Sequence, residues 1–157
     1  MEAMMETLSP DVYTSIRKAL LEQKRDSKNP FMHAFGDIDA AMENIQNFWR
    51  KGQAVLFYDD ADKKHLVGLL IFDVVQYWWS YDFFLSEVLV LNTDKKFHGF
   101  GRIAIKKLEE LADTYKCVGI CSGCILEKNA PLVSNMYKKA GFQIATSNFV
   151  KDMRHEV

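Results

Sequence analysis

The first part of the chain repeats its apolar residues with the period of an α-helix. Ser9 followed by Pro10 is a typical helix start, since serine caps the first turn and proline needs no N–H there. The apolar residues that follow fall on one helical face, at Val12, Ile16, Ala19 and Leu20. After the polar stretch Lys24–Pro30 a second such face is formed by Ile38, Ala41, Met42, Ile45, Phe48 and Trp49. These faces predict two amphipathic helices, the second capped by Asp37 and ended by Gly52.

From Ala54 onward the helical period gives way to short apolar runs that are typical of β-strands. Ala54–Tyr58 and Leu66–Val75 are two such runs, and the charged residues between them predict a hairpin turn. A third strand is predicted over Phe83–Leu91. An aromatic segment precedes it and overlaps its start, with Tyr77, Trp78, Trp79, Tyr81, Phe83 and Phe84. So many aromatic residues are typical of a core or of a homodimer contact, and at a hairpin tip they also suit the wall of an apolar pocket.

The second half of the chain mixes helices and strands. Gly99-Phe100-Gly101 opens a helix whose apolar face is formed by Ala104, Leu108, Leu111, Ala112 and Tyr115. We expect a strand, a helix and two closing strands after it, over Cys117–Cys124, about Pro131–Ala140, near Gln143–Ala145 and over Phe149–Met153. The order α-α-β-β-β-α-β-α-β-β predicts an α/β (α+β) fold in one domain over residues 1–157.

The overall composition excludes several classes of partner. With 20 basic and 21 acidic residues among 157, the chain has no net field that would attract nucleic acid or an anionic membrane. The longest apolar run, Leu66–Val75, is interrupted by Gly68 and Asp73 and is too short to span a bilayer. The acidic N-terminus also lacks the charge pattern of a signal peptide. We therefore expect a soluble, cytoplasmic protein.

Three cysteines, Cys117, Cys121 and Cys124, lie close together in the sequence. A Cys-x-x-Cys pair is typical of zinc or redox sites, but structural zinc needs four ligands, and no second pair of Cys or His has suitable spacing. We interpret the cysteines as reduced thiols in and beside a buried strand, and expect no bound metal.

The junction between the third strand and the next helix is a candidate anion site. A strand that runs through a glycine turn into a helix directs free backbone N–H groups at one point, where they suit a phosphate. Lys95, Lys96, His98 and Arg102 add positive charge around this turn. The alternative is a surface turn with solvated lysines. The segment lacks both the Gly-Lys-Ser/Thr and the three-glycine fingerprints, which disfavours ATP and NAD.

Two motifs resemble those of the GNAT acetyltransferase superfamily. Lys96-x-x-Gly99-x-Gly101 is similar to the family's Gln/Arg-x-x-Gly-x-Gly/Ala cofactor motif, although lysine replaces Gln/Arg and Thr93 replaces a proline at the strand end. Tyr137 begins a Tyr-x-x-x-Gly-Phe segment that resembles the family's C-terminal motif. The resemblance implies the GNAT acyl-CoA N-acyltransferase fold, a mixed twisted sheet that is splayed at the CoA site and flanked by about four helices.

The resemblance also implies acetyl-CoA as the cofactor and assigns residues to its binding. The strand backbone would pair with the pantetheine arm, and the glycine turn would hold the pyrophosphate. These residues are Leu89, Val90, Leu91, Lys96, Phe97, His98, Gly99, Phe100, Gly101 and Arg102, together with Asn129. Asn129 resembles the asparagine that contacts the cofactor arm, but it lies eight residues before Tyr137, where the family has seven.

The implied reaction is direct transfer of an acetyl group to a primary amine, which needs a proton acceptor and a proton donor. The resemblance assigns the donor role to Tyr137. Strand alternation would place Glu87 on the same face as Leu89 and Leu91, where partial burial would raise its pKa and make it a base. The alternative for Glu87 is a carboxylate that faces water. For Tyr137, the alternative is packing against the sheet.

Two questions stay open in the sequence. The acceptor is a small amine, a polyamine, or a lysine or N-terminus of a protein, and no residue discriminates among them. The chain is also compatible with a catalytically inactive GNAT-fold protein that binds CoA or another protein. The departures at Thr93, Lys96 and Asn129 leave room for this second reading.

Overall fold

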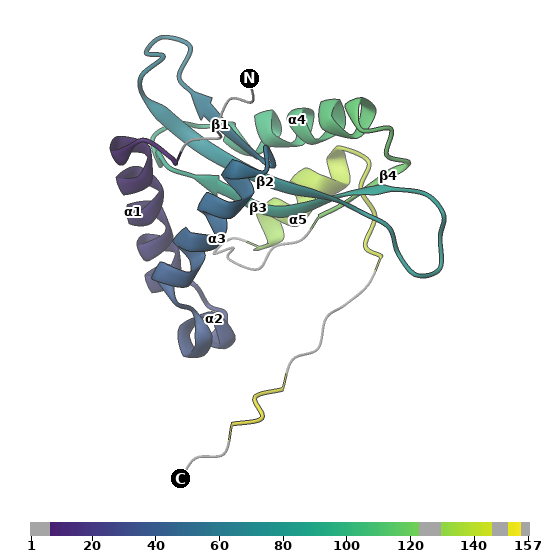
Figure 1. Ribbon diagram of the computed structural model, residues 1–157, viewed down its shortest axis with the longest axis horizontal. Helices are drawn as coiled ribbons and strands as arrows, with labels where there is room; N and C mark the ends of the chain where they lie inside the picture. The colour runs from purple at the N-terminus through teal and green to yellow at the C-terminus, as the bar shows by residue number, and fades with distance from the viewer. Residues whose placement is uncertain (1–6, 123–129, 146–150, 155–157) are drawn as a thin grey trace.

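A computed structural model describes residues 7–122, 130–145 and 151–154 of the chain (Figure 1). Its helices are α1 Pro10–Asp26, α2 Pro30–Phe35, α3 Ile38–Arg50, α4 Phe100–Thr114 and α5 Ala130–Lys139. Its strands are β1 Ala54–Tyr58, β2 Leu66–Val75, β3 Phe84–Asn92 and β4 Gly119–Cys121. The side chains of Ser9 and Asp37 cap α1 and α3 as the sequence predicts.

The four strands form one mixed sheet in the order β1-β2-β3-β4. β1, β2 and β3 are antiparallel neighbours, whereas β4 runs parallel to β3. The parallel pairing is short and ends at the pair Ser86 and Cys121. Within the described residues, the rest of β3 has no strand along this edge, so the pairing covers only Phe84 to Ser86, and we call its end the point where β3 and β4 part. The predicted mixed sheet is confirmed.

β3 contains a one-residue bulge at Val88. Ile71 of β2 pairs with Leu89, but the next β2 residue, Phe72, pairs with Glu87. Val88 therefore has no partner of its own on β2. A bulge of this kind shifts the alternation of side chains along the strand by one residue.

The bulge changes which face of the sheet the β3 side chains occupy. Leu85 packs with residues of α4, whereas Leu89 and Leu91 pack with residues of α1 and α3. Glu87 precedes the bulge and stands two positions from Leu85, so it faces the α4 side. The sequence-based prediction that Glu87 shares a face with Leu89 and Leu91 is therefore wrong, because alternation holds only in a regular strand.

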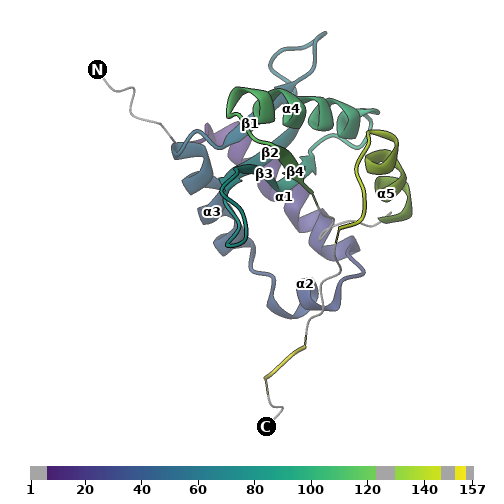
Figure 2. The same cartoon turned by 90° about the vertical axis from the view of Figure 1, so that its right-hand side faces the viewer.

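Helices cover both faces of the sheet, with α4 on one side and α1 and α3 on the other (Figure 2). Ile16 and Met42 are buried against Leu69 in the α1 and α3 layer. Leu108 of α4 is buried against Leu70 on the opposite face. α5 packs beside α4. Each side chain of this size stabilises the fold by about 1.5–3 kcal/mol when fully buried.

Gly68 in β2 makes room for the first turn of α4. A Cβ atom at Gly68 would lie 2.1 Å from the ring of Phe100. The Phe100 ring is only 3% exposed and also meets Phe57 edge-on, with 5.3 Å between ring centroids. The absence of a side chain at Gly68 thus lets Phe100 fix the start of α4 against the sheet.

One helix was not predicted from the sequence. Asn29 accepts hydrogen bonds from the N–H groups of Phe31 and Met32, and Pro30 begins the six-residue helix α2. Asn29-Pro30 is the same kind of start signal as Ser9-Pro10, but it lies at the end of the polar stretch Lys24–Pro30. The described helices therefore number five rather than about four. None of them has the length and apolar content that crossing a membrane requires.

The two closing strands predicted from the sequence are absent from the described residues. Gln143–Ala145 is irregular, and so is the part of Phe149–Met153 that the structure describes. A strand needs a neighbour for its backbone N–H and C=O groups, and neither segment pairs with the described sheet. Ile144 and Met153 are accordingly exposed. Both segments have the apolar pattern of a strand, but such a pattern holds no information about a pairing partner.

We predict that Gly68→Ala lowers the free energy of unfolding by about 1–3 kcal/mol, because its methyl group overlaps the Phe100 ring. Urea unfolding measures the loss. The double variant Gly68→Ala/Phe100→Leu is the control, since the smaller side chain leaves space for the methyl group. It should lose less stability than the sum of the two single variants. Strict additivity would contradict this account of the contact.

Candidate active site

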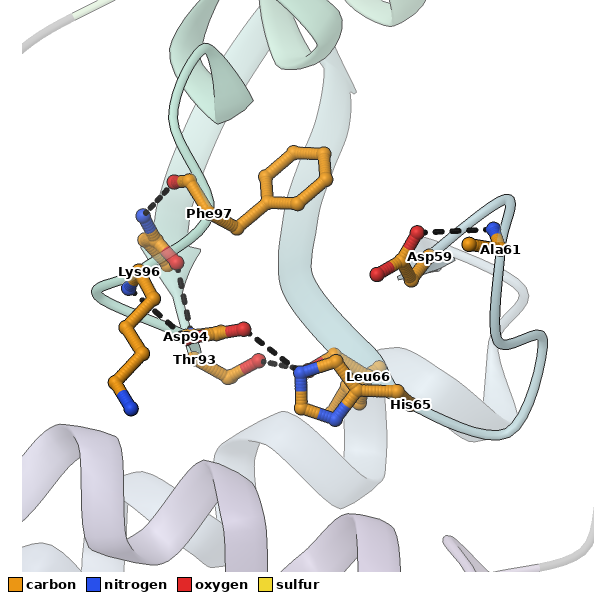
Figure 3. Close-up of polar contacts among 9 residues, drawn as sticks. Asp59, Ala61, His65, Leu66, Thr93, Asp94, Lys96 and Phe97 are labelled. Atoms are coloured by element: carbon orange, nitrogen blue, oxygen red, sulfur yellow. Dashed lines mark hydrogen bonds and ion pairs between the residues drawn. The ribbon is translucent and has the colours of Figure 1, made fainter.

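The loop between β3 and α4 is fixed to the edge of the sheet by hydrogen bonds (Figure 3). Thr93 donates from its N–H to Val67 O and from its hydroxyl to Leu66 O, both at 3.0 Å. The Asp94 carboxylate accepts from the N–H of Lys96 at 2.9 Å. Thr93 stands where the GNAT motif has proline, and its N–H makes a bond that proline lacks. The departure at Thr93 is therefore compatible with an ordered loop.

The glycine turn leaves the start of α4 uncapped. Gly99 has a φ of +86°, which favours glycine, and no side chain caps the helix. The N–H groups of Phe100, Gly101 and Arg102 donate to no backbone carbonyl in the described part of the chain. The first turn also holds no acidic residue. Three N–H groups at a positive helix end form the kind of site that binds phosphate oxygens.

The cationic side chains around this turn differ in their surroundings. Lys95 Nζ lies 3.3 Å from Glu22 and 3.9 Å from Asp26, two carboxylates of α1. Its charge is therefore partly neutralised, which the sequence analysis missed. Lys96 and Arg102 are exposed, and neither forms an ion pair with a described residue. Of the residues predicted to attract phosphate, these two have charges that are available to a ligand.

Phe97, one of the residues predicted to contact the cofactor, holds the loop in place through its own contacts. Its N–H donates to Asp94 O at 3.0 Å, and its ring packs against Val67 and Phe100. His98, the next residue, is exposed. Phe97 thus anchors the loop, while any backbone contact to an anion falls to the residues from His98 onward.

An ion pair connects this loop to the turn between β1 and β2. His65 Nε2 lies 2.7 Å from Asp94 Oδ2 (Figure 3). This bond raises the pKa of His65, and the same bond, with the Lys96 N–H, lowers the pKa of Asp94. The pair is charged on both sides between these two pKa values. It is lost as the pH rises above the first or falls below the second.

Gly101 permits close packing between α4 and α5. A Cβ atom at Gly101 would lie 2.6 Å from Met136 Sδ. At Gly99, by contrast, a Cβ atom would meet nothing within 4 Å, so its backbone conformation alone requires glycine there. Glycine is therefore required at the two positions of the motif for different physical reasons. One shapes the turn, and the other sets the position of α5.

Glu87 and Tyr137 meet where β3 and β4 part. The Tyr137 hydroxyl donates to Glu87 Oε2 at 2.5 Å, which joins the middle of β3 to α5. The sequence analysis proposed Glu87 as the proton acceptor and Tyr137 as the proton donor. In the structure they are in direct contact. Asn129, the remaining predicted contact to the cofactor arm, lies outside the described residues.

The surroundings of Glu87 make its carboxyl group a stronger base than usual. Burial raises the pKa of Glu87, because it disfavours the charged form, while the Tyr137 and Ser122 hydroxyls act in the opposite direction. The Ser122 hydroxyl is buried near Glu87, although it makes no hydrogen bond of normal geometry with a described group. No sequence signal identified Ser122, since it comes near Glu87 only through the parallel pairing of β3 and β4.

The Tyr-x-x-x-Gly-Phe motif forms the end of α5. Gly141 has a φ of +93°, the Phe142 N–H donates to Tyr137 O at 3.0 Å, and the Gly141 N–H donates to Lys138 O at 3.1 Å. These two bonds define a Schellman motif. The rings of Tyr137 and Phe142 pack edge-on with centroids 5.1 Å apart. The motif therefore ends the helix and holds the tyrosine ring in place.

The described residues hold no group of three or more His, Cys, Asp or Glu side chains that would bind a metal ion. Cys117 and Cys121 are free thiols. Burial raises the pKa of the Cys117 thiol, which favours its neutral form. Cys124 lies outside the described residues.

The same fold occurs in solved structures named acetyltransferases. A ribosomal-protein-alanine N-acetyltransferase from Brucella melitensis biovar Abortus 2308 matches with a TM-score of 0.62 and 12% identity, over 94% of this chain and 98% of its own. A possible acetyltransferase from Clostridium difficile 630 has a TM-score of 0.66 and 13% identity, over 96% and 97%. An acetyltransferase from Trypanosoma brucei has a TM-score of 0.57 and 18% identity, over 94% and 97%.

The sequence itself matches no family model and no curated protein. At these low identities the structural likeness shows the fold alone. The chain shares the α/β fold of these acetyltransferase structures, which confirms the fold class that the sequence predicts.

We predict that Glu87→Gln gains stability relative to the natural protein as the pH rises. Burial sets the pKa of Glu87 above its ordinary value near 4.5, so the folded chain retains a proton that the unfolded chain has lost. The contribution of Glu87 to the free energy of unfolding is therefore present at low pH and is lost as the pH rises through the raised pKa. Glutamine has no such loss.

Urea unfolding at a series of pH values from 4 to 8 measures this difference. The exposed Glu109→Gln variant of α4 is the matched control, and its difference from the natural protein should change little with pH. If the difference in the free energy of unfolding between Glu87→Gln and the natural protein is independent of pH, burial does not disfavour the charged form of Glu87.

Proposed function

We propose that the protein is an N-acetyltransferase that moves an acetyl group from acetyl-CoA to a primary amine by direct attack in a ternary complex. The observation that carries this proposal is the hydrogen bond between Tyr137 and Glu87 at the point where β3 and β4 part. A proton donor and a base of raised pKa there meet the two needs of amide formation. The names of the proteins with the same fold support acetyl transfer in general.

The residues on either side of the point where β3 and β4 part are suited to bind acetyl-CoA. The three N–H groups at the start of α4, with Lys96 and Arg102, offer positive charge to its pyrophosphate. Beyond Ser86, the edge of β3 that faces β4 has no described strand beside it, and this edge includes Leu89, Val90 and Leu91. An extended pantetheine arm can use such an edge as an additional strand would. When bound, acetyl-CoA supplies the thioester that is to be cleaved.

The contact between Glu87 and Tyr137 allows the protons of the reaction to balance. An ammonium ion loses two protons as it becomes an amide, and one of them passes to water. Glu87 takes the other as the C–N bond forms, and Tyr137 gives its proton to the sulfur as the C–S bond breaks. The proton on Glu87 then passes to the Tyr137 oxygen across their 2.5 Å bond. Both side chains return to their starting states.

We predict that Tyr137→Phe lowers kcat by about 100-fold, because the departing sulfur loses its proton donor. Its affinity for acetyl-CoA should stay nearly unchanged, because phenylalanine keeps the packing against Phe142. Thiol release with a panel of amines measures kcat, and calorimetry measures binding. A fully active Phe variant would remove Tyr137 from the mechanism. Binding of acetyl-CoA by the natural protein without turnover of any amine would favour an inactive CoA-binding protein.

We predict that Lys96→Ala weakens acetyl-CoA binding about fivefold, since an exposed charge facing a phosphate contributes about 1 kcal/mol. Lys95→Ala is the matched control, because Glu22 and Asp26 already hold the Lys95 ammonium group. Its affinity should change less than twofold. Calorimetric titration of both variants at low salt provides the comparison. Equal losses would mean that the loop acts through net charge rather than through Lys96.

A further inference from the structure

The turn between β2 and β3 presents aromatic side chains that the folded core does not use. Trp78 and Tyr81 are 96% exposed, Trp79 is 61% exposed, and Phe83 is 50% exposed. Figure 1 shows this turn extending beyond the helices that cover the rest of the sheet. Large exposed aromatic groups cost free energy in water, so such a cluster commonly marks a binding surface.

Three of the aromatic residues form an ordered group, which we name the aromatic shelf: Tyr77, Trp79 and Phe84. The rings of Tyr77 and Trp79 are stacked, with centroids 5.4 Å apart and an angle of 3° between their planes. Phe84 contacts Tyr77 at 5.2 Å and Trp79 at 5.8 Å. Trp78, the neighbour of Trp79, takes no part in these ring contacts.

The aromatic shelf is attached to β4 as well as to β2 and β3. The Tyr77 hydroxyl lies 3.0 Å from Cys121 Sγ and donates to it. Phe84 lies over Gly119, where a Cβ atom would come within 3.1 Å of its ring. The shelf therefore spans the three strands that surround the parting of the sheet, and these contacts fix its rings before any ligand binds.

The floor of the shelf is a partly exposed region of one sheet face. Asp73 pairs with Ser86 across β2 and β3, and Ser86 pairs in turn with Cys121 of β4. These residues lie on the face opposite α4, because the intervening Leu85 packs with α4. Asp73 is partly exposed there, and its Oδ1 accepts a hydrogen bond from the Gln53 side chain at 2.9 Å.

The shelf borders the proposed reaction site from the other side of the sheet. The pair Ser86 and Cys121 is the last one before β3 and β4 part, and Glu87 is the next residue of β3. One residue along a strand is about 3.3 Å. A molecule held on the shelf therefore lies at the rim of the opening through which it would reach Glu87 and Tyr137.

The charges along the chain indicate what kind of molecule fits the shelf. Residues 73–87, which form the end of β2, the aromatic turn and the start of β3, hold no Lys or Arg but include Asp73, Asp82 and Glu87. The β4 segment 117–122 has no charged residue at all. In contrast, the following segment 95–107 holds five Lys and Arg residues and no acid. The aromatic end of the sheet thus favours cations, and the start of α4 favours anions.

We propose that the aromatic shelf, together with Asp73, binds the ammonium group of an organic cation, which is the amine acceptor of the reaction. The faces of Tyr and Trp rings attract cations, and the Asp73 carboxylate supplies the opposite charge nearby. The role of this cation as the acceptor rests on the proposed acetyl transfer. The cation site itself rests only on the stacked rings, their attachment to β4 and the absence of Lys and Arg.

Calorimetric titration with choline tests the site without any need for turnover. Choline is a permanent cation, and 3,3-dimethylbutan-1-ol is its neutral counterpart of the same shape. We expect saturable binding of choline at low salt and binding of the neutral alcohol that is at least tenfold weaker. Trp79→Ala should weaken choline binding about fivefold or more. Trp78→Ala is the matched control and should change it less than twofold.

Three results would overturn the cation site: equal binding of choline and the alcohol, equal effects of the two tryptophan variants, or a loss of self-association in both variants. The last result, measured by light scattering, would identify the surface as a contact between two copies of the chain. Acetyl-CoA titrated into the same samples tests the proposed function separately. Failure to bind it would remove the transferase proposal and leave the choline result standing.

With an amine that is acetylated, Trp79→Ala should raise the KM for the amine about fivefold or more while kcat and the KM for acetyl-CoA stay within twofold. Unchanged KM values in a variant that has lost choline binding would show that the shelf binds cations but does not hold the acceptor.

Discussion

The extra residue at Val88 determines how the two helical layers share the central strand. Before the bulge, Leu85 belongs to the core under α4, and after it, Leu89 belongs to the core under α1 and α3. A regular β3 would carry all of these residues on one face and leave the other layer without its contacts. The bulge also falls next to the point where β4 ends its pairing, so the strand bends where the sheet opens.

Small residues rather than large ones set the positions of α4 and α5. Gly68 admits the Phe100 ring, and Gly101 admits Met136, so each helix lies closer to its neighbour than a side chain would permit. Tyr137 then comes within hydrogen-bonding distance of Glu87 because α5 is held against α4 at Gly101 and ends at Gly141. Gly68 and Gly101 thus let the elements of the candidate site approach closely, whereas Gly141 follows the end of α5 with a positive φ.

The sequence was informative where local physics decides the outcome. Helical periodicity predicted α1, α3 and α4, and the capping of α3 by Asp37 followed from its side chain alone. The order of the predicted elements indicates the α/β class, and the two motifs point to an acetyltransferase-like fold. Glu87 and Tyr137 were both proposed, although the reason for Glu87 was wrong.

What the sequence did not reveal involves residues that are distant in the chain. The pairing of Lys95 with Glu22 depends on how α1 lies against the loop, and no local pattern encodes it. The bulge at Val88 depends on the register between β2 and β3. The ring contact of Phe100 with Gly68 joins two elements 32 residues apart in sequence. α2 is different, because the helix-start signal Asn29-Pro30 is local and is present in the sequence.

The uneven placement of charge along segments 73–87 and 95–107 has a consequence for how ligands arrive. The chain carries a formal net charge of −1, yet Asp73 and Asp82 lie toward the aromatic turn, whereas the unpaired charges of Lys96 and Arg102 lie at the start of α4 in the described part of the chain. Such a molecule has a permanent electric dipole. A polyanion and a cation approaching at the same time are turned toward different ends before either touches the surface, and added salt weakens that orientation within about 10 Å. Two oppositely charged ligands therefore need not compete for their first encounter with the protein.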